Sequence, residues 1–151
     1  MGKAKNQADI KLFLQRTIPA TVDRVFRAWT EPDSMKDWFA PPDKETSLAE
    51  VDLRVGGKYR IGFKGKGEEE MRVVSGVYRE IRPPHYLVFT WCWEDDPDKH
   101  ETIVTVELRP QGVQTELRLT HVHFPNEDIR DHHSKGWIGC VESLINNLQK
   151  R

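Results

Sequence analysis

The sequence has few cysteines and no excess of charge of either sign. Its two cysteines, Cys92 and Cys140, lack the CxxC spacing of common zinc and redox motifs. We therefore expect two buried, reduced thiols rather than a disulfide or a catalytic thiol. The 23 basic and 24 acidic side chains give a formal net charge of −1. Without a basic surplus, no nucleic acid partner is predicted.

Long apolar runs are absent from the sequence as well. No stretch approaches the roughly 20 residues that a membrane-spanning helix needs, so no membrane insertion is expected. The charged residues 1–6 lack the apolar segment of a secretory signal, and Asn6 stands where a myristoylation motif needs serine or threonine. By elimination, the sequence predicts a cytoplasmic protein.

The motifs of common nucleotide-dependent and hydrolytic enzymes are also missing. The sequence has no P-loop, no GxGxxG after a predicted strand, no GxSxG and no HExxH. Two acidic turns, residues 68–70 and 94–98, lack the glycine and the ligand spacing of an EF-hand loop. Solvation explains these turns adequately, and we expect no metal and no cofactor.

The pattern of apolar residues predicts strands first and a long helix last. Residues 10–18 alternate as a half-buried strand. Thr21 fits the N-cap of a first short helix, and Pro32 fits the first turn of a second. Gly56 and Gly57 fit a two-residue hairpin turn. Six further alternating segments predict antiparallel strands joined by short turns, at residues 51–55, 59–63, 71–77, 87–93, 104–108 and 117–120.

The last segment has helical rather than alternating spacing. Residues 126–128 give it an acidic start, which suits a helix N-terminus, and apolar residues then recur from Ile129 to Leu148. A strongly curved sheet buries its concave face only against such a helix. We therefore predict an α+β helix-grip fold. In it, a curved antiparallel sheet of about seven strands surrounds a long C-terminal helix, with two short helices after the first strand.

The chain length sets the expected domain organisation. With 151 residues, the chain fits one domain that needs no disulfide or metal to stabilise its core. We expect residues 1–151 to form a single helix-grip domain, with residues 1–8 as a flexible tail.

Several short segments, in their joint order, resemble a known family. They are residues 16–20, 25–30, 38–39, 52–57, 76–78, 87–91, 119–121 and 136–137. The sequence resembles the family related to the C-terminal domain of the activator of the heat-shock-protein-90 ATPase, within the START-like superfamily. This resemblance implies the helix-grip fold and an internal hydrophobic cavity. Its family name suggests a chaperone-related protein partner, and it implies no general catalytic motif.

Aromatic side chains are the strongest sign of a binding site. Five tryptophans are present, and Trp91, Trp93 and Trp137 fall on predicted inward faces. Core packing is the alternative explanation, but Gly136 and Gly139 each cost about 1 kcal/mol of helix propensity relative to alanine, which favours a pocket or a close approach. The predicted cavity lining is Trp38, Phe39, Phe63, Val73, Phe89, Trp91, Val104, Leu119, His121, Trp137 and Val141.

A second set of residues could supply acid–base chemistry. Glu50, Asp52 and Arg54 share one face of a predicted strand, and His121 shares the inward parity of the last strand. Together they would suit a cyclase, dehydratase or hydrolase without a cofactor. The alternative for the strand residues is a solvated face with a weak ion pair. His121 could instead bind a ligand carbonyl or hydroxyl, or be a hydrogen-bonded cavity histidine.

The histidines also raise the question of a metal site. Four histidines, His121, His123, His132 and His133, could converge on zinc from one strand and one helix, but their spacing matches no standard zinc signature.

Our first hypothesis is a monomer or weak homodimer that binds a small hydrophobic or amphipathic molecule in an internal cavity. An enzyme and a chaperone-related interaction module are the alternatives.

Overall fold

One curled antiparallel sheet forms the framework of the described residues. The computed structural model describes residues 10–149, so the predicted tail at residues 1–8 lies outside the described part. Within this part, seven strands follow the order β1-β7-β6-β5-β4-β3-β2. The elements are β1 (Leu12–Ile18), α1 (Val22–Thr30), α2 (Pro32–Trp38), β2 (Lys44–Val51), β3 (Lys58–Gly65), β4 (Met71–Arg82), β5 (Tyr86–Trp93), β6 (Thr102–Gln111), β7 (Gln114–Val122) and α3 (Glu127–Gln149).

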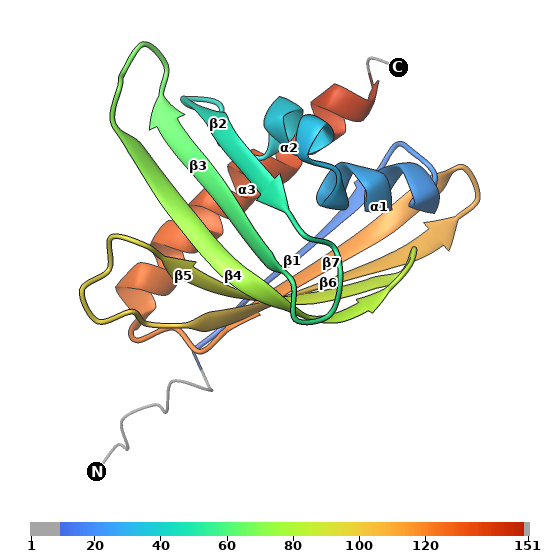
Figure 1. Cartoon of the computed structure of the whole chain (residues 1–151). Coiled ribbons are helices and arrows are strands. Elements are labelled where there is room, and N and C mark those ends of the chain that lie inside the picture. The colour runs from blue at the N-terminus through green and yellow to red at the C-terminus, as the bar shows by residue number, and fades with distance from the viewer. Residues whose placement is uncertain (1–9, 150–151) are drawn as a thin grey trace.

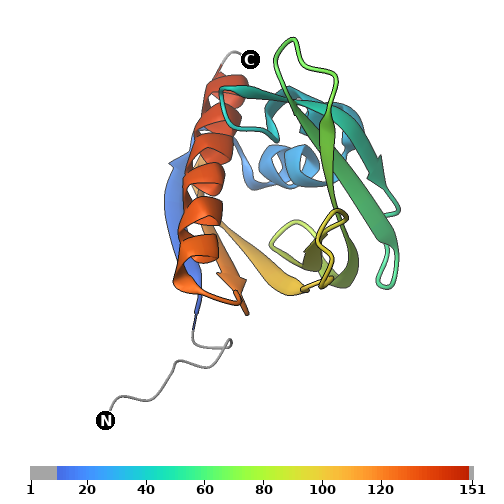
Figure 2. The ribbon, with the colours of Figure 1, turned by 90° about the vertical axis from the view of Figure 1, so that its left-hand side faces the viewer.

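The three helices lie on the concave side of the sheet. The long helix α3 crosses this side, and the short helices α1 and α2 lie toward one end of it (Figures 1 and 2). In the contacts between elements, α3 packs against β1 and α2, α2 packs against β2, and α1 packs against β6 and β7. This arrangement agrees with the predicted helix-grip fold.

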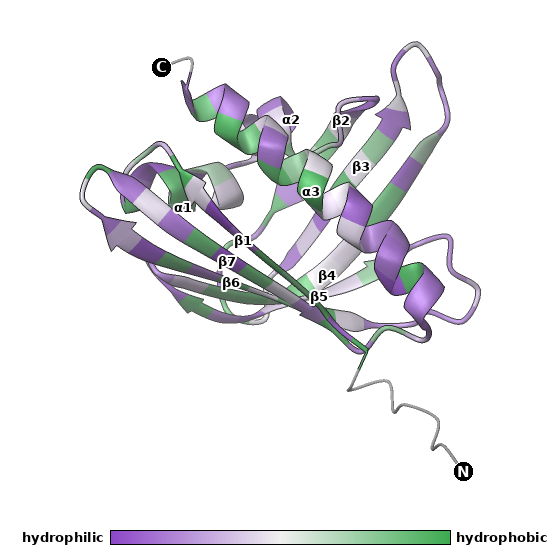
Figure 3. Cartoon of the chain, turned by 180° about the vertical axis from the view of Figure 1, so that it is seen from behind, coloured by the Kyte–Doolittle hydropathy of each residue, from purple (hydrophilic) through white to green (hydrophobic). Residues whose placement is uncertain are grey.

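The sequence signals at the helix ends are only partly used. Asn126 caps α3, because its Oδ1 accepts a hydrogen bond from the backbone N–H of Ile129 at 2.9 Å. Pro32 occupies the first turn of α2, as predicted. Thr21 stands at the N-cap position of α1, but its side chain makes no capping hydrogen bond. In the strands, the alternation of hydrophobic and hydrophilic residues is visible along β6 and β7 (Figure 3).

The strand predicted at residues 51–55 is wrong beyond its first residue. β2 ends at Val51, and residues 52–57 form a loop that leads into β3. Leu53 and Val55 are 42% and 65% exposed, so their alternation does not reflect a buried face. The loop folds back tightly: a Cβ on Gly57 would lie 2.0 Å from the carbonyl oxygen of Asp52. The glycine pair therefore closes a longer loop rather than a two-residue hairpin turn.

Aromatic rings form the part of the core nearest to α2. Trp29 and Trp38 lie with ring centroids 4.7 Å apart, and the Trp38 indole N–H donates to the carbonyl of Ala28 at 2.8 Å. Both cysteines are free thiols; Cys140 is buried and Cys92 is half-buried. Within residues 10–149, no helix combines the length and the apolar character that crossing a membrane requires.

Candidate ligand-binding pocket

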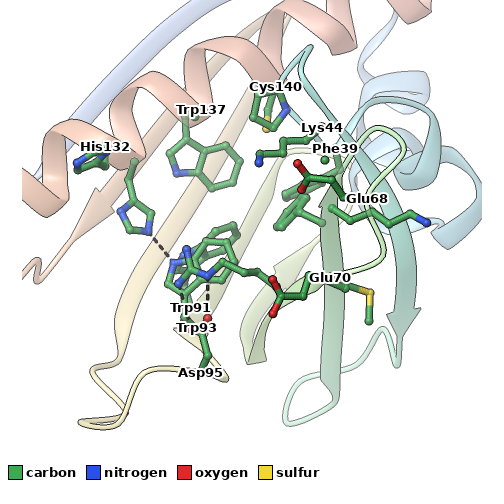
Figure 4. A pocket seen from close by; sticks show the side chains of 18 residues that line it. Phe39, Lys44, Glu68, Glu70, Trp91, Trp93, Asp95, His132, Trp137 and Cys140 are labelled. Atoms are coloured by element: carbon green, nitrogen blue, oxygen red, sulfur yellow. Dashed lines mark hydrogen bonds and ion pairs between the residues drawn. The ribbon is translucent and has the colours of Figure 1, made fainter.

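A pocket of about 790 Å³ lies between α3, the segment after α2, and strands β3, β4 and β5. Five aromatic side chains from these elements line it (Figure 4). They are Phe39 after α2, Phe63 on β3, Trp91 and Trp93 on β5, and Trp137 on α3. Because these rings come from both the sheet and the helices, the fold itself brings them together.

The aromatic rings contact one another in a continuous series. Trp91 and Trp137 have ring centroids 5.1 Å apart, which connects β5 to α3. Phe39 lies 5.6 Å from Trp137 and 6.4 Å from Trp91. Phe63 and Trp93 lie 5.9 Å apart on neighbouring parts of the sheet. These separations fall within the range of favourable aromatic pairs, so the wall is held in place by its own packing.

His121 lies behind this wall and has no exposed surface. Its Nδ1 accepts a hydrogen bond from the indole N–H of Trp137 at 3.0 Å. The proton is therefore on Nε2, which donates to Oγ1 of Thr102 at 2.6 Å, and that hydroxyl donates to the carbonyl of Trp91 at 3.0 Å. Burial, together with nearby His133, lowers the pKa of His121 well below its ordinary value, so the ring is neutral.

This bonding pattern decides which predicted role His121 can fill. Both of its ring nitrogens have protein partners, and it is not among the side chains that line the pocket. It therefore has no free nitrogen for a ligand, a metal ion or a proton transfer. Of the roles considered from the sequence, the structure places it as a hydrogen-bonded structural histidine beneath the pocket wall.

A second pair of indole and imidazole groups joins the sheet to α3 at the pocket. The Trp93 N–H donates to Nε2 of His133 at 2.9 Å, and Nδ1 of His133 donates to the carbonyl of Ile129 at 2.9 Å. Burial is the main cause that lowers the pKa of His133. The guanidinium of Arg72 lies over the Trp93 ring, 4.1 Å from the ring centroid. Arg72 also binds both carboxylate oxygens of Asp95, at 2.8 and 3.0 Å.

The rim of the pocket carries charges of both signs. Its cations are Lys44, Lys64 and Arg72. Lys64 pairs with Glu45 at 3.5 Å, and Arg72 pairs with Asp95 in the turn after β5. Within residues 10–149, Lys44 forms no ion pair at 4.0 Å or less. The acidic side chains of the rim are Glu68, Glu70 and Asp95.

One polar atom in the wall has no partner. The indole nitrogen of Trp91 is buried and, within the described residues, makes no hydrogen bond. A buried donor without an acceptor costs about 1–3 kcal/mol, which makes it a feature to explain in a folded protein. Trp91 lines the pocket with other atoms of its side chain, because the indole nitrogen itself has almost no accessible surface.

Only part of the predicted lining reaches the pocket. Of the predicted lining residues, Phe39, Phe63, Trp91 and Trp137 lie at this pocket. Val73 has the opposite strand parity from buried Val74, so the predicted inward orientation is wrong. The remaining predicted residues are buried in the core instead: Trp38, Phe89, Val104, Leu119, His121 and Val141. They share the concave side, but the helices or neighbouring rings cover them there.

The predicted acid–base residues lie outside the pocket lining. Asp52 and Arg54 pair with each other at 2.8 Å, and their side chains are 52% and 74% exposed. Glu50 is exposed and reaches Arg60 at 3.5 Å. The structure does not bring these groups to His121 or to any shared cavity, because residues 52–57 form a surface loop. The observed geometry therefore agrees with the alternative of a solvated ion pair.

The four histidines do not meet at one point either. The His123 carbonyl accepts a hydrogen bond from Nε2 of His100 at 2.8 Å, and His132 is exposed on α3. Within residues 10–149, no group of three or more histidine, cysteine, aspartate or glutamate side chains is placed to hold a metal ion.

Several pocket residues were not among the predicted site residues. His133 lies four positions before Trp137, so helical spacing alone places both on one face of α3. Trp93 has the same strand parity as Trp91, which also gave a usable signal. Lys44 and Arg72 had no such signal, because an exposed cation in a strand is ordinary.

Comparisons with known proteins agree with this architecture. A family model described as Activator of Hsp90 ATPase homolog 1-like protein matches residues 19–149, which run from before α1 to the end of α3. The chain belongs to this family. No curated protein matches the sequence.

Solved structures show how widely the fold of this Hsp90-activator-homologue family is shared. Protein CV1439 from Chromobacterium violaceum has a TM-score of 0.80 and 24% identity, over 90% of this chain and 95% of that one. Protein NE0264 from Nitrosomonas europaea has a TM-score of 0.79 and 25% identity, over 95% of this chain and 96% of that one. PFC0360w, described as an HSP90 activator from Plasmodium falciparum, has a TM-score of 0.75 and 24% identity, over 93% of this chain and 96% of that one. The likenesses at 24% identity show the fold alone, and together they support the START-like helix-grip assignment.

Proposed function

We propose that this member of the family binds a small hydrophobic or amphipathic molecule in the aromatic pocket. The observation that carries the proposal is a pocket of about 790 Å³ whose wall is built from five aromatic side chains. Known ligand sites range from roughly 300 to 1,000 Å³ and combine an apolar wall with a few polar groups. The charged rim supplies such polar groups here.

Two glycines of α3 support the proposal from the helix side. A Cβ on Gly139 would lie 3.2 Å from side-chain atoms of Pro41 and of Pro42, so this glycine permits close packing against the segment after α2. A Cβ on Gly136 would have no atom within 4 Å, and Gly136 lines the pocket. The helix therefore carries a glycine where no contact among the described residues requires one, at the point where a side chain would enter the pocket.

A side chain at Gly136 provides the sharpest test of this proposal. The Gly136→Leu variant places an isobutyl group in the pocket, whereas Gly136→Ala adds one methyl group. Both substitutions improve helix propensity, so neither is expected to unfold the protein. Binding is measured by the fluorescence of N-phenyl-1-naphthylamine, an uncharged aromatic probe, and native mass spectrometry of fresh protein searches for a retained ligand.

The proposal has clear outcomes in this experiment. We expect the wild type and Gly136→Ala to bind the probe, and Gly136→Leu to bind it at least about tenfold more weakly, because the probe and the new side chain compete for the same volume. Equal binding by the wild type and Gly136→Leu, or no binding of the probe and no retained mass in the wild type, would overturn it.

The other functions considered from the sequence have no specific support in the geometry. The proposed acid–base residues lie at the surface or, for His121, in fully used hydrogen bonds. A chaperone-related partner is suggested by the family name and by one structural neighbour that shows the fold alone. These roles, a cytoplasmic location, the single-domain organisation and a monomeric or weakly dimeric state stay predictions.

A further inference from the structure

The lining of the pocket differs in kind from the rest of the core. Elsewhere the concave side is rich in aliphatic residues, such as Val104, Leu119 and Leu144, which have no exposed surface. Among the described residues that line the pocket, none is valine, leucine or isoleucine. The apolar wall instead consists mainly of aromatic rings. This separation indicates that the pocket is shaped for flat π-systems rather than for a flexible alkyl chain.

Aromatic rings reach the pocket from different elements. Trp137 comes from α3, Trp93 from β5 and Phe63 from β3. A planar ligand placed among them gains offset-stacked and edge-to-face contacts in addition to the buried area. An alkyl chain gains only the buried area and also loses rotational freedom about each of its bonds. Both effects, the ring contacts and the smaller loss of rotational freedom, therefore favour a planar aromatic ligand over an alkyl chain.

A cation on the rim of the pocket favours a ligand that carries a negative charge. Of its three cations, Arg72 is held by Asp95 and Lys64 by Glu45, whereas Lys44 has no carboxylate within ion-pair distance among the described residues. Lys44 pairs in register with Gly65, and the carboxylate of Glu68 lies over that glycine. Figure 4 shows the Lys44 side chain extending across the pocket in the direction of Trp137. Its ammonium group is thus the rim cation that has no carboxylate partner among the described residues.

The acidic residues of the rim are exposed, as Lys44 is. Glu68 and Glu70 belong to the exposed loop between β3 and β4, where water can hydrate them. Glu68 is turned back against the hairpin, because a Cβ on Gly65 would lie 2.5 Å from its Oε2. Its charge is close to the mouth but does not form an ion pair with Lys44. Removing the charge of Glu68 should therefore favour an anionic ligand, which makes Glu68→Gln the matched counterpart of a Lys44 variant.

We infer that the pocket selects a planar aromatic acid, with its rings against Phe63, Trp93 and Trp137 and its carboxylate or sulfonate at Lys44. This inference rests on the proposed function and adds the chemical class of the ligand. It needs no catalytic step, no metal and no cofactor.

The charge preference is tested with two probes that share one ring system. 8-Anilinonaphthalene-1-sulfonate carries a sulfonate, and N-phenyl-1-naphthylamine is the same skeleton without it. We expect Lys44→Gln to weaken binding of the sulfonate probe about fivefold and to leave the uncharged probe within about twofold, since a partly exposed ion pair contributes about 1 kcal/mol. Lys44→Arg should restore most of the loss, and Glu68→Gln should tighten only the sulfonate probe.

The ring preference needs competitors of equal charge. 2-Naphthoate and decanoate each carry one carboxylate and have similar numbers of heavy atoms. We expect 2-naphthoate to displace N-phenyl-1-naphthylamine at a concentration at least about fivefold lower than decanoate, because stacking adds to the buried area for the naphthyl ring only. Gly136→Leu shows in both assays that the probe occupies this pocket.

The outcomes separate the two proposals. If no probe binds, or if binding ignores Gly136→Leu, the proposed function itself fails. If the probes bind in the pocket but Lys44→Gln affects the charged and the uncharged probe alike, the anionic part of the inference is overturned. If decanoate competes as well as 2-naphthoate, the aromatic part is overturned, and in both cases the pocket remains a binding site.

Discussion

The indole N–H of Trp137 and Nδ1 of His121 form a hydrogen bond of 3.0 Å that joins α3 to β7 beneath the pocket. A second such pair is present, because Trp93 donates to His133 on the same helix at 2.9 Å. In each pair a neutral imidazole accepts from an indole. The two bonds connect α3 to the sheet at separate points, so they fix the distance across which the pocket forms.

Removing the His121 imidazole should destabilise the fold. In His121→Phe, the buried N–H of Trp137 loses its acceptor, and a buried unsatisfied donor costs about 1–3 kcal/mol. Repacking of the larger ring adds to this, so we expect the free energy of unfolding to fall by about 2–4 kcal/mol in urea denaturation. The exposed His132→Ala should change it by less than about 0.5 kcal/mol. Equal small effects of both substitutions would contradict the structural role of His121.

Stability should fall as the pH drops below about 6.5. Burial lowers the pKa of both His121 and His133 in the folded protein, whereas in the unfolded chain a histidine titrates near 6.5. Below that pH the unfolded chain therefore binds more protons, and each histidine removes up to about 1.4 kcal/mol per pH unit. Above it, their contribution is fully present. Arg72 and His132 act in the same direction on His133, since their positive charges disfavour its protonation.

A non-titrating variant isolates this effect from the carboxylates. Glutamine at position 133 can accept the Trp93 N–H without changing charge, so His133→Gln should show a shallower loss of stability between pH 7.5 and 5.5. The pKa values of Glu94, Asp95 and Asp96 are lowered, so these groups lose their contribution only at more acidic pH. Urea denaturation at pH 7.5, 6.5 and 5.5 measures the difference. The prediction would be contradicted if the free energy of unfolding of the wild type stayed constant or increased as the pH is lowered from 7.5 to 5.5.

The loop at residues 52–57 gives a prediction in which the backbone matters and the charges do not. Asp52→Asn breaks only an exposed ion pair with Arg54, so unfolding and probe binding should both stay unchanged, with stability within about 0.5 kcal/mol. In Gly57→Ala, the new Cβ meets the backbone oxygen of Asp52 at 2.0 Å and the loop must open. We expect a loss of about 2–4 kcal/mol. A large effect of Asp52→Asn on binding would revive its proposed acid–base role.

The order of strands and helices could be predicted because it follows from local periodicity. Trp91, for example, was assigned to the concave face by the alternation along its strand, and it lies there. Periodicity shows which face of a strand a residue is on, but not which helix or ring covers that face. Phe89 shares the parity of Trp91, but it packs against Tyr59 and Tyr78 at centroid distances of 5.4 and 6.1 Å, while Trp91 lines the pocket. Which part of the concave face stays open depends on where α1, α2 and α3 pack.

The loop and rim residues show a second limit of the sequence. Residues 51–55 alternate as well as any true strand, yet the backbone turns after Val51 because the glycines that follow permit a tight loop. Lys44 could not be singled out, since its role depends on the ion pairs that its neighbours form with other residues. His121 was recognised as inward-facing, but only the positions of Trp137 and Thr102 show that both its nitrogens are used.

The two glycines of α3 should respond in opposite ways to the same substitution. At Gly136 a methyl group meets no atom within 4 Å, so Gly136→Ala gains helix propensity and should raise the free energy of unfolding by about 0.5–1 kcal/mol. At Gly139 the methyl group would lie 3.2 Å from each of Pro41 and Pro42, whose rings are stiff. The resulting overpacking outweighs the gain in propensity, so Gly139→Ala should lower stability by about 1 kcal/mol.

Urea denaturation of both alanine variants measures this contrast directly. Because the two sites lie three positions apart on one helix, a general change in helix propensity would move both values in the same direction. Opposite signs would show that α3 approaches the segment after α2 at Gly139 and stands clear of the protein at Gly136. An equal gain at both positions would mean that the helix does not contact Pro41 and Pro42, and that the pocket wall there is looser than the structure has it.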